Sequence, residues 1–292
     1  MMSSGFETAL GEITLVLFTT LAPSGAFAFM IMAGVLACGK LDGALRRRID
    51  KFLCIPLSVS MVGLIASATH LGNPANALYV FMGVGRSPLS TEVFCAVIFL
   101  FLTGVYWLYS FARKPKVALQ RVWAVGIVIA AAAFITAVAL AYDAETIVSW
   151  STPFVPIGVW LNAIVGGPLV ALLAFRAARA EDIVGRCGSM LCGLSFAAVT
   201  ANTVVYALQG FGLPGIENSF GSAAELVPAF GFVVAAFFAC CAAATALMYS
   251  SVRAGKDSGS GRSLASCALA FAGIFLMRFV FYMMHMTVGL GV

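Results

Sequence analysis

The segment LQRVWAVGIVIAAAAFITAVALAY, residues 119–142, decides the fold class of this chain. From Val122 to Tyr142 it holds no charged residue, and that run matches the roughly 20 residues that a helix needs to cross a bilayer core. Backbone groups in lipid must find hydrogen-bond partners within the structure, so such a run is a helix. The other spanning fold, a β-barrel, would show alternating strands of about ten residues, and the sequence has no such pattern.

Similar runs recur along the chain. We predict an all-α integral membrane protein with eight transmembrane helices in a single anchor domain over residues 1–292. The predicted spans are about 11–38, 51–71, 90–112, 119–142, 154–176, 185–208, 225–250 and 263–289. Composition agrees, because 62% of the residues are hydrophobic and only 10% are charged, against about 25% charged in soluble domains. Glu7 and Glu12 flank the start of the first span, where a signal peptide would carry a basic segment, so we expect no signal peptide.

Basic residues predict the orientation. All but two of the 17 lie in alternate connections between the spans, and the exceptions are Arg86 and Arg278. The residues in these connections are Lys40, Arg46, Arg47, Arg48, Lys51, Arg113, Lys114, Lys116, Arg121, Arg176, Arg179, Arg186, Arg253, Lys256 and Arg262. By the positive-inside rule these connections are cytoplasmic, so both termini are expected on the non-cytoplasmic side.

Cysteine and histidine usage argues against metal chemistry on this chain. The eight cysteines are scattered through apolar segments without a CxxC pair, and we interpret them as small buried residues. We therefore expect no iron–sulfur cluster and no other metal site. The only two histidines are too few to ligate two haems, and we expect no haem, although counting alone leaves open a single haem between His70 and His285.

A few ionisable residues lie in or at the ends of the predicted spans, where burial of a charge in lipid is energetically unfavourable. His70 ends the second predicted span, His285 lies near the outer end of the eighth, and Glu92 opens the third. Histidine beside a carboxylate at one membrane face is suited to proton transfer near neutral pH. Other interpretations stay open, since a helix-end His or Glu also serves as an anchor or a cap. Arg278, well inside the eighth span, is either functional or the partner of a buried carboxylate or carbonyl.

The segment ASATHLGNPANALYVFMGVGRSPLSTE, residues 66–92, resembles the membrane-anchor subunits of bacterial dimethyl sulfoxide reductases. In that family a His-Leu-Gly ends the second span, and a Gly-x-Ser-x-Leu-Ser-x-Glu-like stretch opens the third. Three later stretches agree in the same order: Tyr142-Asp143 through Trp150 to Thr152-Pro153, Pro156-Ile157-Gly158 with Gly166-Gly167-Pro168-Leu169, and Arg278-Phe279-Val280-Phe281-Tyr282 with His285-Met286-Thr287-Val288-Gly289. The resemblance thus extends over most of the chain.

The resemblance implies the anchor subunit of a molybdoenzyme complex of anaerobic respiration in the cytoplasmic (inner) membrane. Such a subunit binds and oxidises menaquinol and passes electrons to an iron–sulfur subunit, which feeds a molybdopterin subunit on the outer face. The partners are those two subunits, lipid and quinone, with no nucleic acid. The family's quinol-site residues map onto His70 and Glu92.

Further quinol contacts are expected from residues near these two. Tyr79 and Phe81 are predicted to flank the quinol ring between the second and third spans, with Arg86, His285 and Arg278 as additional candidates. Two alternatives remain at this point. One is the anchor of a polysulfide- or nitrite-type reductase, and the other is a secondary transporter, which would show inverted repeats and helices interrupted at mid-membrane.

Overall fold

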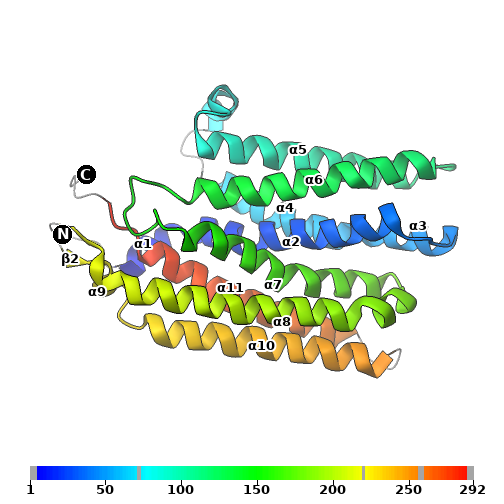
Figure 1. The fold of residues 1–292 in the computed structure, drawn as a ribbon. Helices are drawn as coiled ribbons and strands as arrows, with labels where there is room; N and C mark the ends of the chain where they lie inside the picture. Colours follow the sequence, from blue (N-terminus) through cyan, green and yellow to red (C-terminus); the bar gives the residue numbers. More distant parts are fainter. Residues whose placement is uncertain (1–4, 71–73, 219–220, 256–259, 288–292) are drawn as a thin grey trace.

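The computed structural model describes residues 5–70, 74–218, 221–255 and 260–287, and it is mostly α-helical (Figure 1). Leu71, Gly72, Asn73, Lys256, Val288 and Gly289, which were used above, lie outside these ranges. The elements are α1 (Gly5–Gly11), α2 (Ile13–Cys38), α3 (Gly43–Phe52), α4 (Cys54–Ala68), η1 (Pro74–Gly83), α5 (Pro88–Ser110), α6 (Val117–Ala141), α7 (Phe154–Ala177), α8 (Glu181–Gly212), η2 (Leu213–Gly215), β1 (Glu217–Asn218), β2 (Gly221–Ser222), α9 (Ala223–Leu226), α10 (Phe230–Ala254) and α11 (Ser260–Met283).

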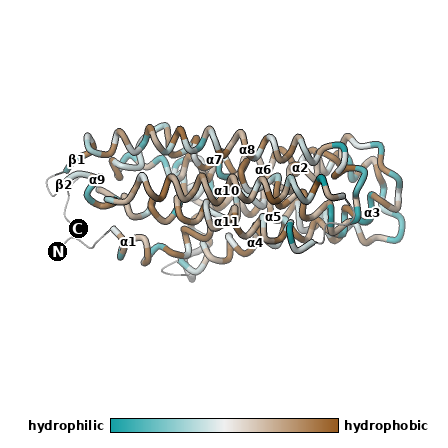
Figure 2. Tube along the Cα trace, turned by 90° about the horizontal axis from the view of Figure 1, so that it is seen from below, coloured by the Kyte–Doolittle hydropathy of each residue, from teal (hydrophilic) through white to brown (hydrophobic). Residues whose placement is uncertain are grey.

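Eight spans of the described chain are long and apolar enough to cross a membrane, which confirms the predicted count and fold class. They cover residues 13–38, 43–68, 88–109, 117–141, 154–177, 181–215, 230–254 and 260–283. Hydrophilic residues gather mainly at the two ends of the bundle, with a largely apolar zone between them (Figure 2). This distribution matches what a bilayer requires of a spanning bundle.

Several span boundaries differ from the predicted ones by a few residues, and two of these differences have an identifiable reason. The second span begins at Gly43 instead of about residue 51, because the Asp42 side chain accepts a hydrogen bond from the Ala44 N–H at 3.1 Å and starts α3 there. The seventh begins at Phe230 instead of about residue 225. The residues before it form the separate short helix α9, and Pro228 follows, which cannot continue a helix hydrogen-bond ladder.

Helix α2 lies at the centre of the bundle and packs against α4, α6 and α7. Figure 1 shows α5 and α6 along one side of it and α8 and α10 along the other. The α2–α4 contact is close, since a Cβ atom at Gly63 would lie 2.8 Å from the Ala22 nitrogen. Gly167 also has no room for a side chain, because a Cβ atom there would lie 2.7 Å from Cδ1 of Phe27. The Gly166-Gly167-Pro168 motif therefore serves close packing of α7 on α2, as small residues do between membrane helices.

The basic end of the bundle is closed by a buried polar network. Tyr106 of α5 donates to Oδ1 of Asp50 at 2.9 Å, and Gln120 of α6 donates to its Oδ2 at 3.3 Å. Arg46, one turn before Asp50 on α3, donates to Gln120 at 3.2 Å and to the Leu36 carbonyl at 2.9 Å. These contacts fix α3 against the α5–α6 pair.

The opposite end brings together segments that are far apart in sequence. Helix α1 packs on α11, with the Phe6 and Phe279 ring centroids 5.3 Å apart. The connection between α6 and α7 is tied to the end of α11, because Val148 N–H donates to the Met286 carbonyl at 3.0 Å. The start of α2 and the end of α4 lie at this same end (Figure 1). The residues described below are therefore neighbours in space.

Candidate functional site

A cavity of about 230 Å³ lies at the end of the bundle that carries α1 and the end of α11. It combines two histidines, one carboxylate and three large aromatic side chains. Its lining residues are Thr8, Glu12, Leu15, His70, Tyr142, Trp150, Tyr282 and His285. Both histidines of the chain therefore line one cavity, although they lie 215 positions apart in the sequence.

His70 and Glu12 form an ion pair when the histidine is protonated. His70 follows directly on the C-cap of α4, and Glu12 sits between α1 and α2, so the close α2–α4 packing brings them together. Nε2 of His70 lies 3.2 Å from Oε2 of Glu12, and the two side chains are 44% and 33% exposed. The Glu12 oxygen is itself shielded from solvent and has no hydrogen-bond partner of good geometry among the described groups. The contact places a carboxylate directly beside the imidazole.

His285 lies across the same cavity against Trp150. Their ring centroids are 5.1 Å apart at an interplanar angle of 73°. Trp150 is held by its indole N–H, which donates to the Phe281 carbonyl at 3.1 Å. Burial lowers the pKa of His285, and the negative charge of Glu12 opposes part of that effect. The lowered pKa favours the neutral imidazole, the form that can accept a proton.

Arg278 lies behind the aromatic wall of this cavity. Its guanidinium carbon is 4.1 Å from the centroid of Phe281, 5.2 Å from that of Tyr142 and 5.6 Å from that of Tyr282. Its Nε donates to the hydroxyl of Thr19 on α2 at 2.9 Å. No carboxylate of the described residues is within ion-pair distance of it. Aromatic faces and one hydroxyl thus compensate this buried cation.

Glu92 is buried near Tyr142 but does not line the cavity. Its side chain is only 4% exposed, and its Oε2 atom has no hydrogen-bond partner among the described residues. Burial raises the pKa of Tyr142 well above its ordinary value, and the nearby Tyr282 and Glu92 raise it further, while Arg278 opposes the rise. Tyr142 thus stands between the cavity and two buried ionisable groups.

The other residues expected from the sequence lie apart from this cavity. Arg86 lines a separate cavity of about 180 Å³ at the junction of the start of α5 and the end of α6. Tyr79 and Phe81 lie on η1 and are 69% and 38% exposed. Neither side chain lines the space beside His70.

Sequence reasoning missed Glu12 as a site residue, and also Tyr142, Trp150 and Tyr282. In the sequence Glu12 indicates the absence of a basic leader, and a carboxylate at the start of a buried apolar helix is also a signal for a functional site. Within the described residues, no group of three or more His, Cys, Asp or Glu side chains is arranged to hold a metal ion. The arrangement is instead that of two imidazoles and a carboxylate beside flat aromatic rings.

Comparison with known proteins places this sequence in a family. Residues 4–284 match the family described as DMSO reductase anchor subunit. The sequence is 30% identical to the C subunit of the anaerobic dimethyl sulfoxide reductase of Escherichia coli K12, over all of this protein and 99% of the relative. It is 29% identical to the protein of that name in Haemophilus influenzae, over 97% of this protein and 98% of the relative.

A comparison of folds extends the likeness. The structure of bd oxidase from Geobacillus thermodenitrificans contains a polypeptide that superposes with a TM-score of 0.54 at 13% identity. The match covers 96% of this chain and 86% of the other, and it concerns the fold alone. The sequence matches extend over nearly the whole length and agree with the eight-span bundle. This chain belongs to the DMSO reductase anchor subunit family.

Proposed function

We propose that this chain oxidises menaquinol at the cavity between His70 and His285 and passes the electrons to an iron–sulfur subunit. A molybdopterin subunit of the same complex then reduces dimethyl sulfoxide or a similar acceptor. The observation that carries the proposal is that both histidines and Glu12 line one cavity in a protein of this family. The relatives are named as parts of anaerobic dimethyl sulfoxide reductases, which implies partner subunits for this protein.

The lining residues suit the chemistry of a quinol. Oxidation of a quinol releases two electrons and two protons, so a site for it needs proton acceptors near two hydroxyl groups. His70 and His285 supply two bases, and the Trp150 and Tyr142 rings supply flat apolar surface for an aromatic head group. The chemistry of the donor set therefore fits this substrate.

His70 and Glu12 act together in the proposed mechanism. With Nε2 of His70 turned to Glu12 at 3.2 Å, Nδ1 is left as the atom that accepts a proton from a hydroxyl group. The resulting imidazolium is stabilised by the carboxylate beside it. Glu92, buried next to Tyr142, is proposed as a second carboxylate that takes up a proton near the site.

His285 serves the second hydroxyl group in this proposal. Burial keeps its imidazole neutral at neutral pH, so it accepts a hydrogen bond or a proton without first losing one. Trp150 packs against the ring and limits its orientation. The tie between Ser149 and the residues after α11 holds Trp150 and His285 on the same side, since the Met286 N–H donates to the Ser149 hydroxyl at 3.3 Å.

The proposed orientation places this cavity at the non-cytoplasmic face of the cytoplasmic membrane. The basic connections lie at the opposite end of the bundle, which the positive-inside rule assigns to the cytoplasm. The partner subunits then dock at the end that carries the cavity, so that electrons travel a short distance. Protons released there leave on the same side.

Purification of the tagged protein from its native membrane tests the assignment. The proposal predicts that two further subunits co-purify, that they carry iron and molybdenum, and that the complex reduces dimethyl sulfoxide with menaquinol as donor. Isolation of the tagged protein alone from membranes that hold an active complex would contradict it.

A further inference from the structure

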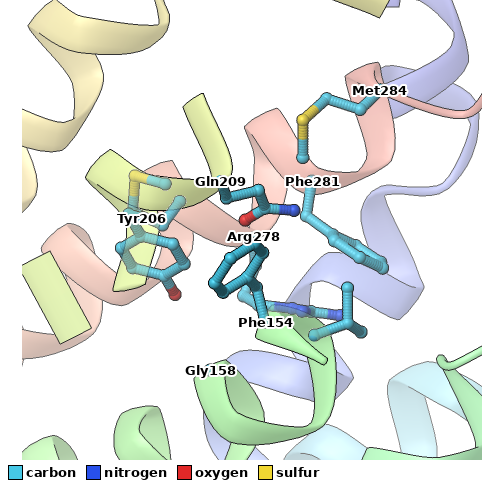
Figure 3. A pocket seen from close by; sticks show the side chains of 9 residues that line it. Phe154, Gly158, Tyr206, Gln209, Arg278, Phe281 and Met284 are labelled. Carbon is cyan, nitrogen blue, oxygen red and sulfur yellow. The ribbon is translucent and has the colours of Figure 1, made fainter. Parts of the chain in front are cut away.

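A much smaller cavity than the two described above lies between α7, α8 and α11. Its volume is about 10 Å³, and Gly158, Tyr206, Gln209 and Arg278 are among its lining residues. Figure 3 shows these residues around the cavity together with the rings of Phe154 and Phe281. Arg278 lines this cavity, and its guanidinium also contacts Tyr142 and Tyr282, which line the cavity of the two histidines.

Two hydrogen-bond donors at this cavity have no partner among the protein groups that the structure describes. They are Nη2 of Arg278 and Nε2 of Gln209. The two side chains are only 3% and 5% exposed, so bulk solvent does not reach them. Burying an unpaired amide donor is unfavourable, and burying an unpaired guanidinium N–H is more so. Neither atom has a hydrogen-bond acceptor of good geometry among the described groups.

The other side of the cavity offers oxygen atoms. Asn202 donates to Oδ1 of Asn162 at 2.9 Å, and Asn162 donates to the Tyr206 hydroxyl at 2.8 Å. The Oδ1 atom of Asn202 is buried and has no partner among the described groups. Gly158 lies next to both, because a Cβ atom there would be 3.8 Å from Asn202 Oδ1 and 4.0 Å from the Tyr206 hydroxyl. Tyr206 lines the cavity together with Arg278 and Gln209, and Asn202 and Asn162 lie behind it.

We propose that this cavity is a binding site for one water molecule. A water needs about 10–15 Å³ of such volume and two to four polar partners, so the space fits one water and no larger ligand. The water accepts hydrogen bonds from Arg278 and Gln209 and donates one to the Tyr206 hydroxyl oxygen, so it has three polar partners. It thereby joins Arg278 to the hydrogen-bonded series Asn202–Asn162–Tyr206 and holds the guanidinium against the wall of the first cavity.

Gly158→Ala tests the site with one added methyl group. The nearest described atom to that Cβ is Cε1 of Tyr206 at 3.7 Å, which is ordinary van der Waals contact, so the methyl fits without a clash. In a dry cavity the change raises the melting temperature, since alanine favours a helix over glycine and fills space. At a water site the methyl displaces the water and leaves Arg278 and Gln209 unpaired, which lowers the melting temperature. The proposal predicts the fall.

Two further variants show whether a fall in the melting temperature of Gly158→Ala reports a displaced water. Gly126→Ala is the matched control, because nothing lies within 4 Å of its Cβ position on α6, and we expect an unchanged or slightly raised melting temperature. Gln209→Leu removes one of the two donors. At a water site it lowers the melting temperature, whereas in a dry cavity the loss of an unpaired buried donor raises it.

The water can also be observed directly. A cryo-electron microscopy map of the intact complex that resolves waters is predicted to show one density within hydrogen-bond distance of Arg278 and Gln209. The Gly158→Ala map is predicted to lack it. An empty cavity in the parent, a larger ligand there, or a rise in melting temperature for Gly158→Ala and Gln209→Leu would overturn the proposal. None of these outcomes depends on quinol oxidation, so this test is separate from that of the proposed function.

Discussion

Nε2 of His70, at the end of α4, lies 3.2 Å from Oε2 of Glu12, at the start of α2. This pair links a residue that the sequence singled out to one that it did not. It also links the packing of the bundle to the proposed chemistry, because α2 and α4 must pack closely for the pair to form. The first two predictions follow from these two links.

Glu12→Gln is expected to slow quinol oxidation. The amide is nearly the same size as the carboxylate but carries no charge, so it no longer stabilises a protonated His70. Positioned proton transfer contributes roughly 10²–10⁴-fold to a rate, and we expect at least a tenfold loss of kcat with menaquinol when its charged partner is removed. Glu145→Gln, on an exposed residue of the α6–α7 connection, is the control and is expected to keep the parental rate. Equal rates for the two variants would contradict the role of Glu12.

Gly63→Ala is expected to lower both the folding stability of the protein and its rate of quinol oxidation. The added Cβ would lie 2.8 Å from the Ala22 nitrogen and 3.2 Å from the Phe18 carbonyl oxygen, which are backbone atoms of α2 that cannot simply turn aside. Overpacking of this kind costs about 1–3 kcal/mol of folding free energy. We expect a lower melting temperature and slower quinol oxidation.

The matched control for this substitution is Gly34→Ala on α2, where nothing lies within 4 Å of the Cβ position. It is expected to leave both quantities unchanged. A Gly63→Ala protein as stable as this control would show that the α2–α4 contact does not need the glycine.

Arg278→Lys is expected to lower stability although it keeps the charge. The flat guanidinium covers the Phe281 ring at 4.1 Å while its Nε donates to Thr19 at 2.9 Å, and a compact ammonium group cannot make both contacts. A buried cation–π contact and a charged hydrogen bond each contribute about 2 kcal/mol. The measurement is the melting temperature of the purified complex. Arg179→Lys, at the basic end of the bundle, is the control, and an equal effect of the two substitutions would contradict the account.

The lowered pKa of His285 predicts how stability depends on pH. Since burial lowers the pKa in the folded protein, the unfolded polypeptide binds a proton at this position at a higher pH than the folded protein does. The contribution of His285 to the free energy of unfolding is therefore present at neutral pH. It falls as the pH drops through the ordinary histidine pKa near about 6.5. His285→Gln is expected to lose less stability than the parent between pH 7.5 and about pH 5.5.

The effect at His285 is small, because its side chain remains partly exposed. It is measured as the difference in melting temperature between the two pH values for each protein. A variant whose pH dependence is steeper than that of the parent would contradict the lowered pKa.

Much of the fold was predictable because the bilayer imposes it. Uncharged runs such as Val122–Tyr142 have one stable form in lipid, and the eight predicted spans appear in the structure. The predicted second span begins after the basic run Arg46–Arg48, but Asp42 caps a helix that carries these residues at the end of the bundle. Local capping thus set a boundary that hydropathy missed.

The site was predictable only in part, because tertiary packing decides which helix ends meet. His70 and His285 were expected on the same face, and they share one cavity. Tyr79 and Phe81 were expected beside His70 because they follow it closely in sequence, yet they lie on the exposed η1 helix. Glu12 lines the cavity because α2 packs on α4, and Trp150 lines it because the α6–α7 connection is hydrogen-bonded to the end of α11. Neither contact can be predicted from a local sequence pattern.

The central claim is that His70 serves quinol oxidation, and the most direct test compares two electron donors on one variant. His70→Gln is assembled into the complex, and dimethyl sulfoxide reduction is measured with menaquinol and with an artificial dye that reduces the partner subunits directly. We predict parental activity with the dye and a loss of at least roughly 10²-fold with menaquinol, the scale of positioned proton transfer. Menaquinol-driven reduction at the parental rate by the assembled variant would contradict the account.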